Sequence, residues 1–275
     1  MSFNSRHGRG LRSRLVATAA AALAAVSVAT APQAQAALVG VSTTRDPVHG
    51  FPSWYEDAAG IRLKLCIESD FCLGGNNLPD TEAPADLETN FPDEAFYAVA
   101  RAETALNGGG RIRYRAVLEG AFANEVPAVN EQIVFTRVQV TGDKINTGVY
   151  PPGTVLRFET PYGELSAAVG RDGKLSRSRV EADAGDVADG FRAPVLETTT
   201  GYGRNFLRWT SGAPAGHIGN PAVLHRVTGG RSYTNALGVT AVRNSLQVFR
   251  GANSVSGVPV VLFEVAGQCY AANCS

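Results

Sequence analysis

The sequence predicts an all-β protein, an immunoglobulin-like or related β-sandwich with two β lobes. Apolar and polar residues alternate in many short runs, which is typical of half-buried strands. Only 18% of the residues are charged, and 30 glycines and 14 prolines supply turns. The runs recur at intervals of roughly 8 to 14 residues with turns between them, which favours sandwiches over βαβ units.

The first 36 residues are typical of a secretory signal peptide. An apolar stretch over 15–30 is too short to span a membrane, and Ala34-Gln35-Ala36 places small residues before a cut at Ala37. An N-terminal membrane anchor is the alternative, which the break at Pro32 disfavours. No later stretch is long and apolar enough to span a bilayer, so we expect no membrane span after processing. The basic start of this segment is acid-free and holds Arg6, Arg9, Arg12 and Arg14.

Removing the signal peptide changes the charge of the chain. The full chain has 25 Lys+Arg and 25 Asp+Glu, and residues 1–36 hold four arginines and no acids. The remaining 239 residues therefore hold 21 bases and 25 acids, a net charge of −4. A mildly acidic exported protein has no electrostatic reason to bind nucleic acid or anionic lipid.

We expect an N-terminal β domain over 37–147 and a C-terminal β-sandwich domain over 148–275. In the first, strands are predicted over 61–67, 111–118 and 132–140. The strand over 111–118 has arginines at 111, 113 and 115 on one face and apolar residues on the other.

The segment 92–106 fits two predictions. Pro92 and the acids after it, with glycines at 108–110, are typical of a helix with its stop. The same residues also alternate, and Asn107-Gly108 could turn a strand into the one over 111–118. We favour this hairpin and leave a short helix open.

In the second domain, the run 154–160 leads to a turn at 161–163. Asp172-Gly173 between the runs 164–170 and 174–182 predicts a further hairpin. Strands are also expected over 222–229, 245–251 and 258–267, and a long loop over 73–92.

All four cysteines lie in the exported part, where an even number indicates disulfides. Three pairings are possible, and the close spacings favour Cys66–Cys72 and Cys269–Cys274. A zinc site is the alternative, but neither spacing has the usual C-x2-C step and no histidine is near.

Seven segments, taken in order, carry a resemblance to a known group: 50–72, 91–100, 118–124, 132–140, 148–150, 161–163 and 214–235. They resemble a group of uncharacterised secreted bacterial β-rich proteins. No activity is assigned to that group. The resemblance covers nearly the whole exported chain. It implies export and a β fold, and it implies no catalytic residues.

Trp54 and Tyr55 are candidate ligand-facing residues, because two aromatics beside two carboxylates are typical of sugar sites. Packing at the edge of a β domain is the alternative. Glu56 and Asp57 are adjacent, so on an extended chain they face opposite ways and are not by themselves a glycosidase pair.

Searches for other chemistry give few candidates. The sequence has no G-x-S-x-G elbow, and we assign no catalytic residues. Asp183, Asp186 and Asp189 are candidate calcium ligands, although their spacing by three is not that of an EF-hand. A solvated acidic turn is the alternative, and we expect no cofactor other than calcium.

We therefore expect a secreted, extracellular or cell-surface protein with a non-catalytic binding or matrix-associated role. Expected partners are an extracellular glycan, the cell envelope or a protein. The alternatives are a secreted hydrolase, acting on glycans or esters with a dispersed active site, and a calcium-stabilised structural module.

Overall fold

The computed structural model describes residues 38–73, 79–80, 82–84, 86–176, 178–181, 184–196, 202–271 and 274. Contacts divide the chain into Met1–Gln33 and Ala34–Ser275, and all described residues belong to the second unit. They form eighteen strands and one short helix, α1 (Ala193–Leu196), so the all-β prediction is confirmed. The predicted signal peptide lies outside the described residues. No helix in the described part is long and apolar enough to cross a membrane.

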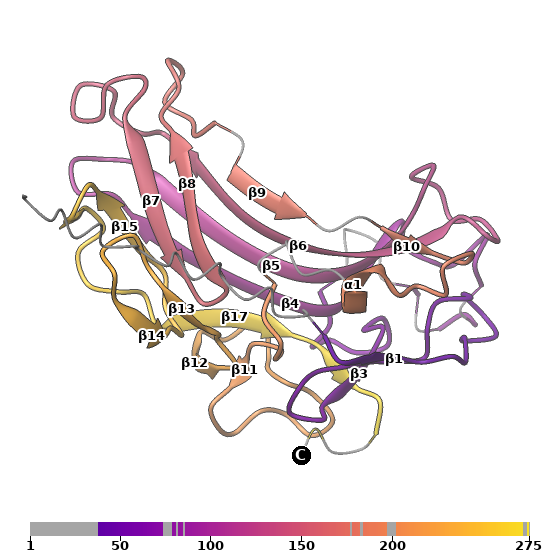
Figure 1. Cartoon of the computed structure of the whole chain (residues 1–275). Helices are drawn as coiled ribbons and strands as arrows, with labels where there is room; N and C mark the ends of the chain where they lie inside the picture. Colours follow the sequence, from indigo (N-terminus) through magenta and orange to yellow (C-terminus); the bar gives the residue numbers. More distant parts are fainter. Residues whose placement is uncertain are drawn as a thin grey trace, which may run out of the picture. The chain divides into compact units, whose positions relative to one another are not determined.

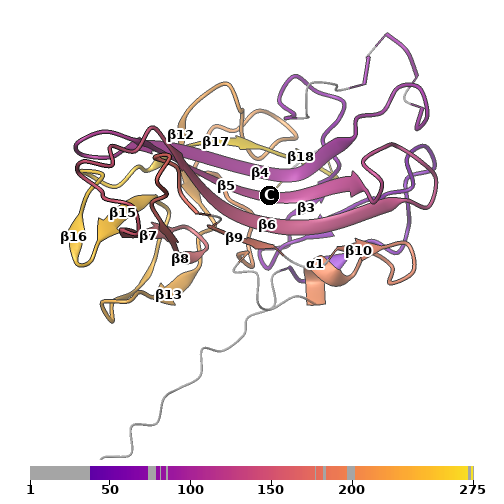
Figure 2. The ribbon, with the colours of Figure 1, turned by 90° about the horizontal axis from the view of Figure 1, so that it is seen from above.

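The largest sheet is built on three long antiparallel strands that run side by side (Figures 1 and 2). Its order is β10-β6-β5-β4-β17-β12-β11, and β9 also pairs with β6. The bounds are β4 (Glu94–Ala105), β5 (Arg111–Phe122), β6 (Gln132–Asp143), β9 (Ser178–Glu181), β10 (Gly185–Asp186), β11 (Arg208–Trp209), β12 (His225–Thr228) and β17 (Leu262–Ala266).

The ambiguous segment is a strand. β4 and β5 form the predicted hairpin and pair from Glu94↔Ala121 to Ala105↔Arg111, with a register shift between Phe96 and Ala98. Glycines at 108–110 all adopt positive φ in the turn, which side chains disfavour. Pairing on both edges, with β5 and β17, outweighs the helix-like start of the segment.

Three smaller sheets complete the fold. Their orders are β1-β2-β3-β18, β16-β15-β7-β8 and β13-β14. The bounds are β1 (Gly40–Val41), β2 (Tyr55–Glu56), β3 (Arg62–Lys64), β7 (Val155–Thr160), β8 (Gly163–Ala168), β13 (Ser232–Thr234), β14 (Thr240–Val242), β15 (Gln247–Arg250), β16 (Asn253–Ser254) and β18 (Gln268–Cys269).

The hairpin predicted at Asp172-Gly173 forms at its turn but does not continue as a long ladder. The bridge Val169↔Leu175 closes it, with hydrogen bonds from the Gly170 amide to the Lys174 carbonyl and from the Ser176 amide to the Ala168 carbonyl. β8 itself pairs with β7 across the turn at 161–163. β9 then pairs with the edge of β6 instead of with β8. A long strand with an open edge offers more ladder hydrogen bonds than the short local partner.

The expected boundary near residue 147 falls inside the second unit. β17 and β12, from the predicted C-terminal domain, extend the sheet of β4, β5 and β6. β18, at the C-terminus, pairs with β3. Residues on both sides of 147 therefore share two sheets.

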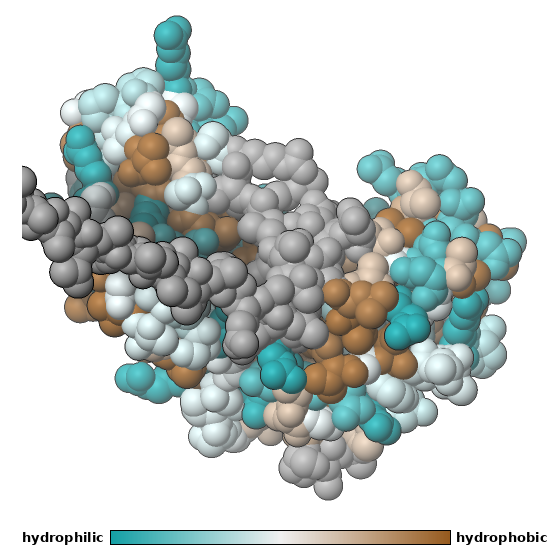
Figure 3. All heavy atoms as spheres, in the orientation of Figure 1, coloured by the Kyte–Doolittle hydropathy of each residue, from teal (hydrophilic) through white to brown (hydrophobic). Residues whose placement is uncertain are grey.

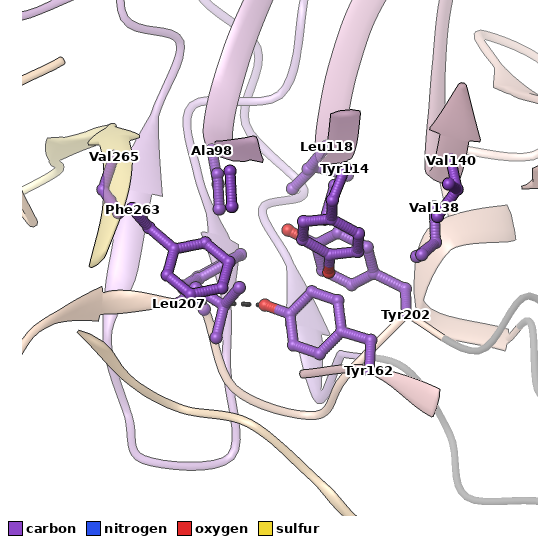
Figure 4. Packing of buried hydrophobic residues seen from close by; sticks show 14 of the residues in the cluster. Ala98, Tyr114, Leu118, Val138, Val140, Tyr162, Tyr202, Leu207, Phe263 and Val265 are labelled. Atoms are coloured by element: carbon purple, nitrogen blue, oxygen red, sulfur yellow. Dashed lines mark hydrogen bonds between the residues drawn. The ribbon is translucent and has the colours of Figure 1, made fainter. Parts of the chain in front are cut away.

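One core fills the side of the large sheet that we call the inner face. On β5 it takes every second residue, including Ile112, Tyr114 and Leu118. Figure 4 shows Tyr162, Tyr202, Leu207 and Phe263 packed with Tyr114. The Tyr162 hydroxyl accepts a hydrogen bond from the Leu207 amide, at 2.9 Å, and so ties the chain after 201 to the core.

The outer face of the same sheet carries the intervening side chains. A small apolar cluster of Phe96, Val99, Val117 and Ala266 covers part of it, with Leu73 packed against them. On β5 this face also carries the arginines at 111, 113 and 115, as the alternation predicts. Elsewhere, hydrophilic and apolar side chains are mixed on the surface seen in Figure 3.

The cysteines form the two favoured pairs. Cys66 and Cys72 have Cα atoms 5.1 Å apart, and Cys269 and Cys274 have Cα atoms 5.4 Å apart. The Cys66–Cys72 pair closes a loop. Leu73, which follows this loop, packs against the apolar cluster on the outer face.

We expect replacement of Cys66 and Cys72 together by serine to lower the free energy of unfolding by about 2 kcal/mol, because a short loop is released in the unfolded chain. Urea denaturation of the variant, compared with the oxidised wild type, checks this value. A loss below about 0.5 kcal/mol would contradict the role of this pair as a clip.

Candidate functional site

A cleft of about 950 Å³ lies on the outer face of the large sheet. We call it the outer-face cleft. Its floor comes from β4, β5, β6 and β17, and one wall is the segment 258–261 that enters β17. Its volume is within the range of small-molecule sites. Its charged and polar lining residues are Arg101, Glu103, Arg113, Arg115, Gln139, Thr141 and Glu264.

The strand register places four polar side chains in one row across the floor. Arg115 is opposite Gln139 of β6 and opposite Arg101 of β4, and Arg101 is opposite Glu264 of β17. Directly opposed residues share a face and have Cβ atoms about 5 Å apart. The row therefore crosses the sheet as Gln139, Arg115, Arg101, Glu264.

Arg101 and Arg115 are like charges in a cross-strand pair, an arrangement that is destabilising without an anion. Arg101 forms no hydrogen bond or ion pair with any described residue, and the Nε of Arg115 has no hydrogen-bond partner among them. Burial lowers the pKa of Arg115, Glu119 opposes this effect, and Arg101 lowers the pKa further. Arg115 also lies 3.9 Å from the buried Glu119 carboxylate and 4.9 Å from the Phe96 ring. Arg101 is therefore the guanidinium of this pair whose donors have no partner among the described residues.

Arg113, one row further along, is already neutralised. Its Nη1 donates to Asp143 at 2.7 Å and its Nε donates to Glu103 at 3.1 Å. Arg111 donates to the same Asp143 carboxylate at 3.2 Å. Hydrogen bonds from Arg113 and Arg111 lower the pKa of Asp143. Arg111 and Arg113 therefore organise the sheet, and the arginine that remains for a ligand is Arg101, with Arg115 opposite it.

The cleft has an exposed aliphatic wall. Val258 is 83% exposed, Leu224 is 56% exposed and Leu262 is 42% exposed. All three line the cleft. Large apolar side chains exposed together beside a cleft are typical of interaction sites.

Glu103 and Glu264 are the two carboxylates of the cleft. Their surroundings bear on the alternative that the protein is a hydrolase. Glu264 is opposite Arg101, and Glu103 is two residues beyond Arg101 on the same face. Glu103 is bound by Arg113 at 3.1 Å and is 3.8 Å from Arg111. Glu103 therefore lies in an ion-pair network and not in the apolar pocket that is typical of a glycosidase general acid.

A second hollow, of about 460 Å³, lies between residues 39–43 and residues 190–195. Two arginines, Arg45 and Arg192, line it, and Arg45 is held by other parts of the chain. The guanidinium lies 5.2 Å from the Phe191 ring and donates to the Val187 carbonyl at 3.0 Å. These contacts favour a structural role for this hollow.

The two aromatic residues predicted from the sequence are not part of the outer-face cleft. Tyr55 is fully buried, and its hydroxyl donates to the Phe191 carbonyl at 2.8 Å. Trp54 is half-buried, and its ring lies 4.3 Å from the Arg62 guanidinium. Tyr55 therefore packs in the core, and Trp54 stacks with a cation at the edge of its sheet.

The adjacent carboxylates have different surroundings, as their alternation predicts. Glu56 forms an ion pair with Arg62 at 2.7 Å. Asp57 is fully buried and accepts hydrogen bonds from the amides of Ala59, Ile61 and Phe206. It therefore joins the β2–β3 turn to the chain after 201.

Of the three candidate calcium ligands, Asp183 lies outside the described residues. Asp186 and Asp189 accept hydrogen bonds from backbone amides of their own turn. No group of three or more histidine, cysteine, aspartate or glutamate side chains in the described part could hold a metal ion. Calcium binding stays a prediction.

The cleft residues were not selected from the sequence, although one signal for them was visible. The arginines at 111, 113 and 115 mark a charged strand face. Which of them lies in a cleft depends on the placement of β17 beside β4, and these strands are far apart in the sequence.

Comparisons with protein-family models, with curated proteins and with solved structures find no match for this chain. The resemblance to secreted bacterial β-rich proteins stays a prediction.

Proposed function

We propose that this protein is an exported, non-catalytic binding protein whose ligand occupies the outer-face cleft. The observation that carries the proposal is Arg101, a guanidinium without a hydrogen bond or ion pair among the described residues, which faces Arg115 across the strands and lies beside an exposed aliphatic wall. A guanidinium that is partly desolvated and beside a like charge gains stability when an anion binds.

Export is proposed on two grounds. Residues 1–36 have the pattern of a cleaved signal peptide, and two cysteine pairs lie at disulfide distance, as is common outside the cytoplasm. We propose a secreted or cell-surface protein with a sandwich related to immunoglobulin-like folds. Its proposed partners are components of the cell envelope, extracellular glycans or proteins.

Retention of the purified protein on envelope preparations of the producing organism and on a glycan array tests this function. We expect wild-type protein to be retained on at least one of them. Arg101→Glu should reduce retention at least about tenfold, because it replaces a free donor with a like charge for an anionic ligand. Arg226→Glu is the matched control, because Arg226 is an exposed arginine of β12 outside the cleft lining.

Equal retention of the two variants would place the binding surface elsewhere. No retention of the wild type on either support would remove the binding function. Far-ultraviolet circular dichroism of each variant checks that the fold is kept.

A further inference from the structure

The charge balance of the outer-face cleft limits what it can bind. Its lining holds three arginines and two glutamates, a net charge of +1. Glu264 flanks Arg101 on one side, so a second negative charge on the ligand would be repelled there. A monovalent anion therefore matches the cleft better than a dianionic phosphate.

Arg101, which has no partner among the described residues, and Arg115, which shares its charge with Glu119, match a carboxylate in geometry. They come from directly opposed residues of neighbouring strands, which places their roots about 5 Å apart. A carboxylate has two oxygens that can accept from separate donors, and guanidinium groups bind such planar anions well. Gln139, next in the row, adds an amide donor beside Arg115.

The aliphatic wall of the cleft indicates the chemical nature of the ligand beyond its carboxylate. Its exposed side chains, Leu224, Val258 and Leu262, are aliphatic. The one aromatic residue in the lining, Tyr114, is 1% exposed and packs in the core, so it offers no ring face to a sugar. Sugar sites commonly use an aromatic platform, whereas an aliphatic wall suits an alkyl chain.

We infer that the outer-face cleft binds an aliphatic carboxylate, with its head group between Arg101 and Arg115 and its chain along Leu224, Val258 and Leu262. This inference rests on the proposed function, because it names the ligand class of the same cleft.

Isothermal titration of the purified protein with decanoate, octanoate and decan-1-ol tests the ligand class. We expect decanoate to bind at least about tenfold more tightly than decan-1-ol, since a hydrogen bond to a charged group is lost in the alcohol. Octanoate should bind more weakly than decanoate, by up to about fourfold for each methylene removed.

The variants test the place of binding. Arg101→Gln should weaken decanoate binding at least about tenfold while changing decan-1-ol binding little, because only the carboxylate uses the guanidinium. Arg226→Gln makes the same change outside the cleft and should alter decanoate binding less than twofold. Leu262→Ser should weaken decanoate and decan-1-ol alike. If Arg101→Gln does not fold, the comparison of decanoate with decan-1-ol on the wild type still decides whether the cleft prefers a carboxylate.

The outcomes separate the two proposals. Equal binding of decanoate and decan-1-ol, or no binding of either, overturns the carboxylate inference. If retention on the cell envelope is nevertheless lost in Arg101→Glu, the binding function stands with another ligand. If decanoate does not bind and retention is unchanged in Arg101→Glu, both proposals are wrong.

Discussion

Replacing Asp57 with alanine is expected to lower the free energy of unfolding by about 3–5 kcal/mol. The Asp57 side chain is fully buried, and its two oxygens accept from three backbone amides, two in the β2–β3 turn and one at Phe206. Without the carboxylate, these buried amides lose their partners. Arg208, 3.8 Å away, loses its nearest anion as well.

Urea denaturation followed by tryptophan fluorescence measures the effect, since Trp54 and Trp209 lie in the two segments that Asp57 joins. Glu56→Ala is the matched control, because it removes the neighbouring carboxylate from an ion pair with the half-exposed Arg62. Its expected cost is at most about 1 kcal/mol. Equal losses for the two variants would contradict the role assigned to Asp57.

The second large effect is expected for Glu159→Gln, at about 2–4 kcal/mol. Glu159 of β7 is 7% exposed and accepts from Arg157 at 2.8 Å, from Asn235 at 2.6 Å and from Arg243 at 2.8 Å. Asn235 and Arg243 flank β14, so this carboxylate fastens the β13–β14 hairpin to β7. The amide removes the charge that balances two largely buried arginines.

The pH dependence of the same variant gives an independent test. Burial would raise the pKa of Glu159, but hydrogen bonds from Arg157, Asn235 and Arg243 outweigh it, and the net pKa is lowered. A carboxyl whose pKa is lower in the folded state contributes its full stability above its unfolded pKa of about 4.3. That contribution is lost as the pH falls through the folded pKa.

The difference in unfolding free energy between wild type and Glu159→Gln should therefore be constant from pH 7 to 5 and shrink below about pH 4. Asp172→Asn is the control, because its carboxylate is 63% exposed and its amide oxygen can still cap the turn. A difference that stays constant down to pH 3 would contradict the stabilising role assigned to the ionised Glu159 carboxylate.

Much of the fold follows from alternation in the sequence. The arginines at 111, 113 and 115 alternate with apolar residues, and β5 has these arginines on its outer face. The predicted strands over 132–140 and 154–160 correspond to β6 and β7. Pairing partners were harder to predict, because β9 pairs with β6 rather than across the Asp172-Gly173 turn.

The candidate site could not be predicted because it depends on long-range register. Arg101 looks like any exposed strand arginine until β17 brings Glu264 and the aliphatic wall beside it. Trp54 and Tyr55 were selected by residue type, but the Tyr55 ring packs in the core and its hydroxyl donates to a backbone carbonyl there. Local composition indicates which side chains could bind a ligand, and tertiary pairing decides which of them face a cleft.

The most direct test of the proposed binding site is a map of backbone amide chemical shifts during titration with decanoate. The largest changes should fall on the row Gln139, Arg115, Arg101 and Glu264 and on the wall residue Leu262, with little change at Trp54. Saturable changes centred on Trp54 and Arg62, or no saturable changes at all, would contradict a binding site in the outer-face cleft.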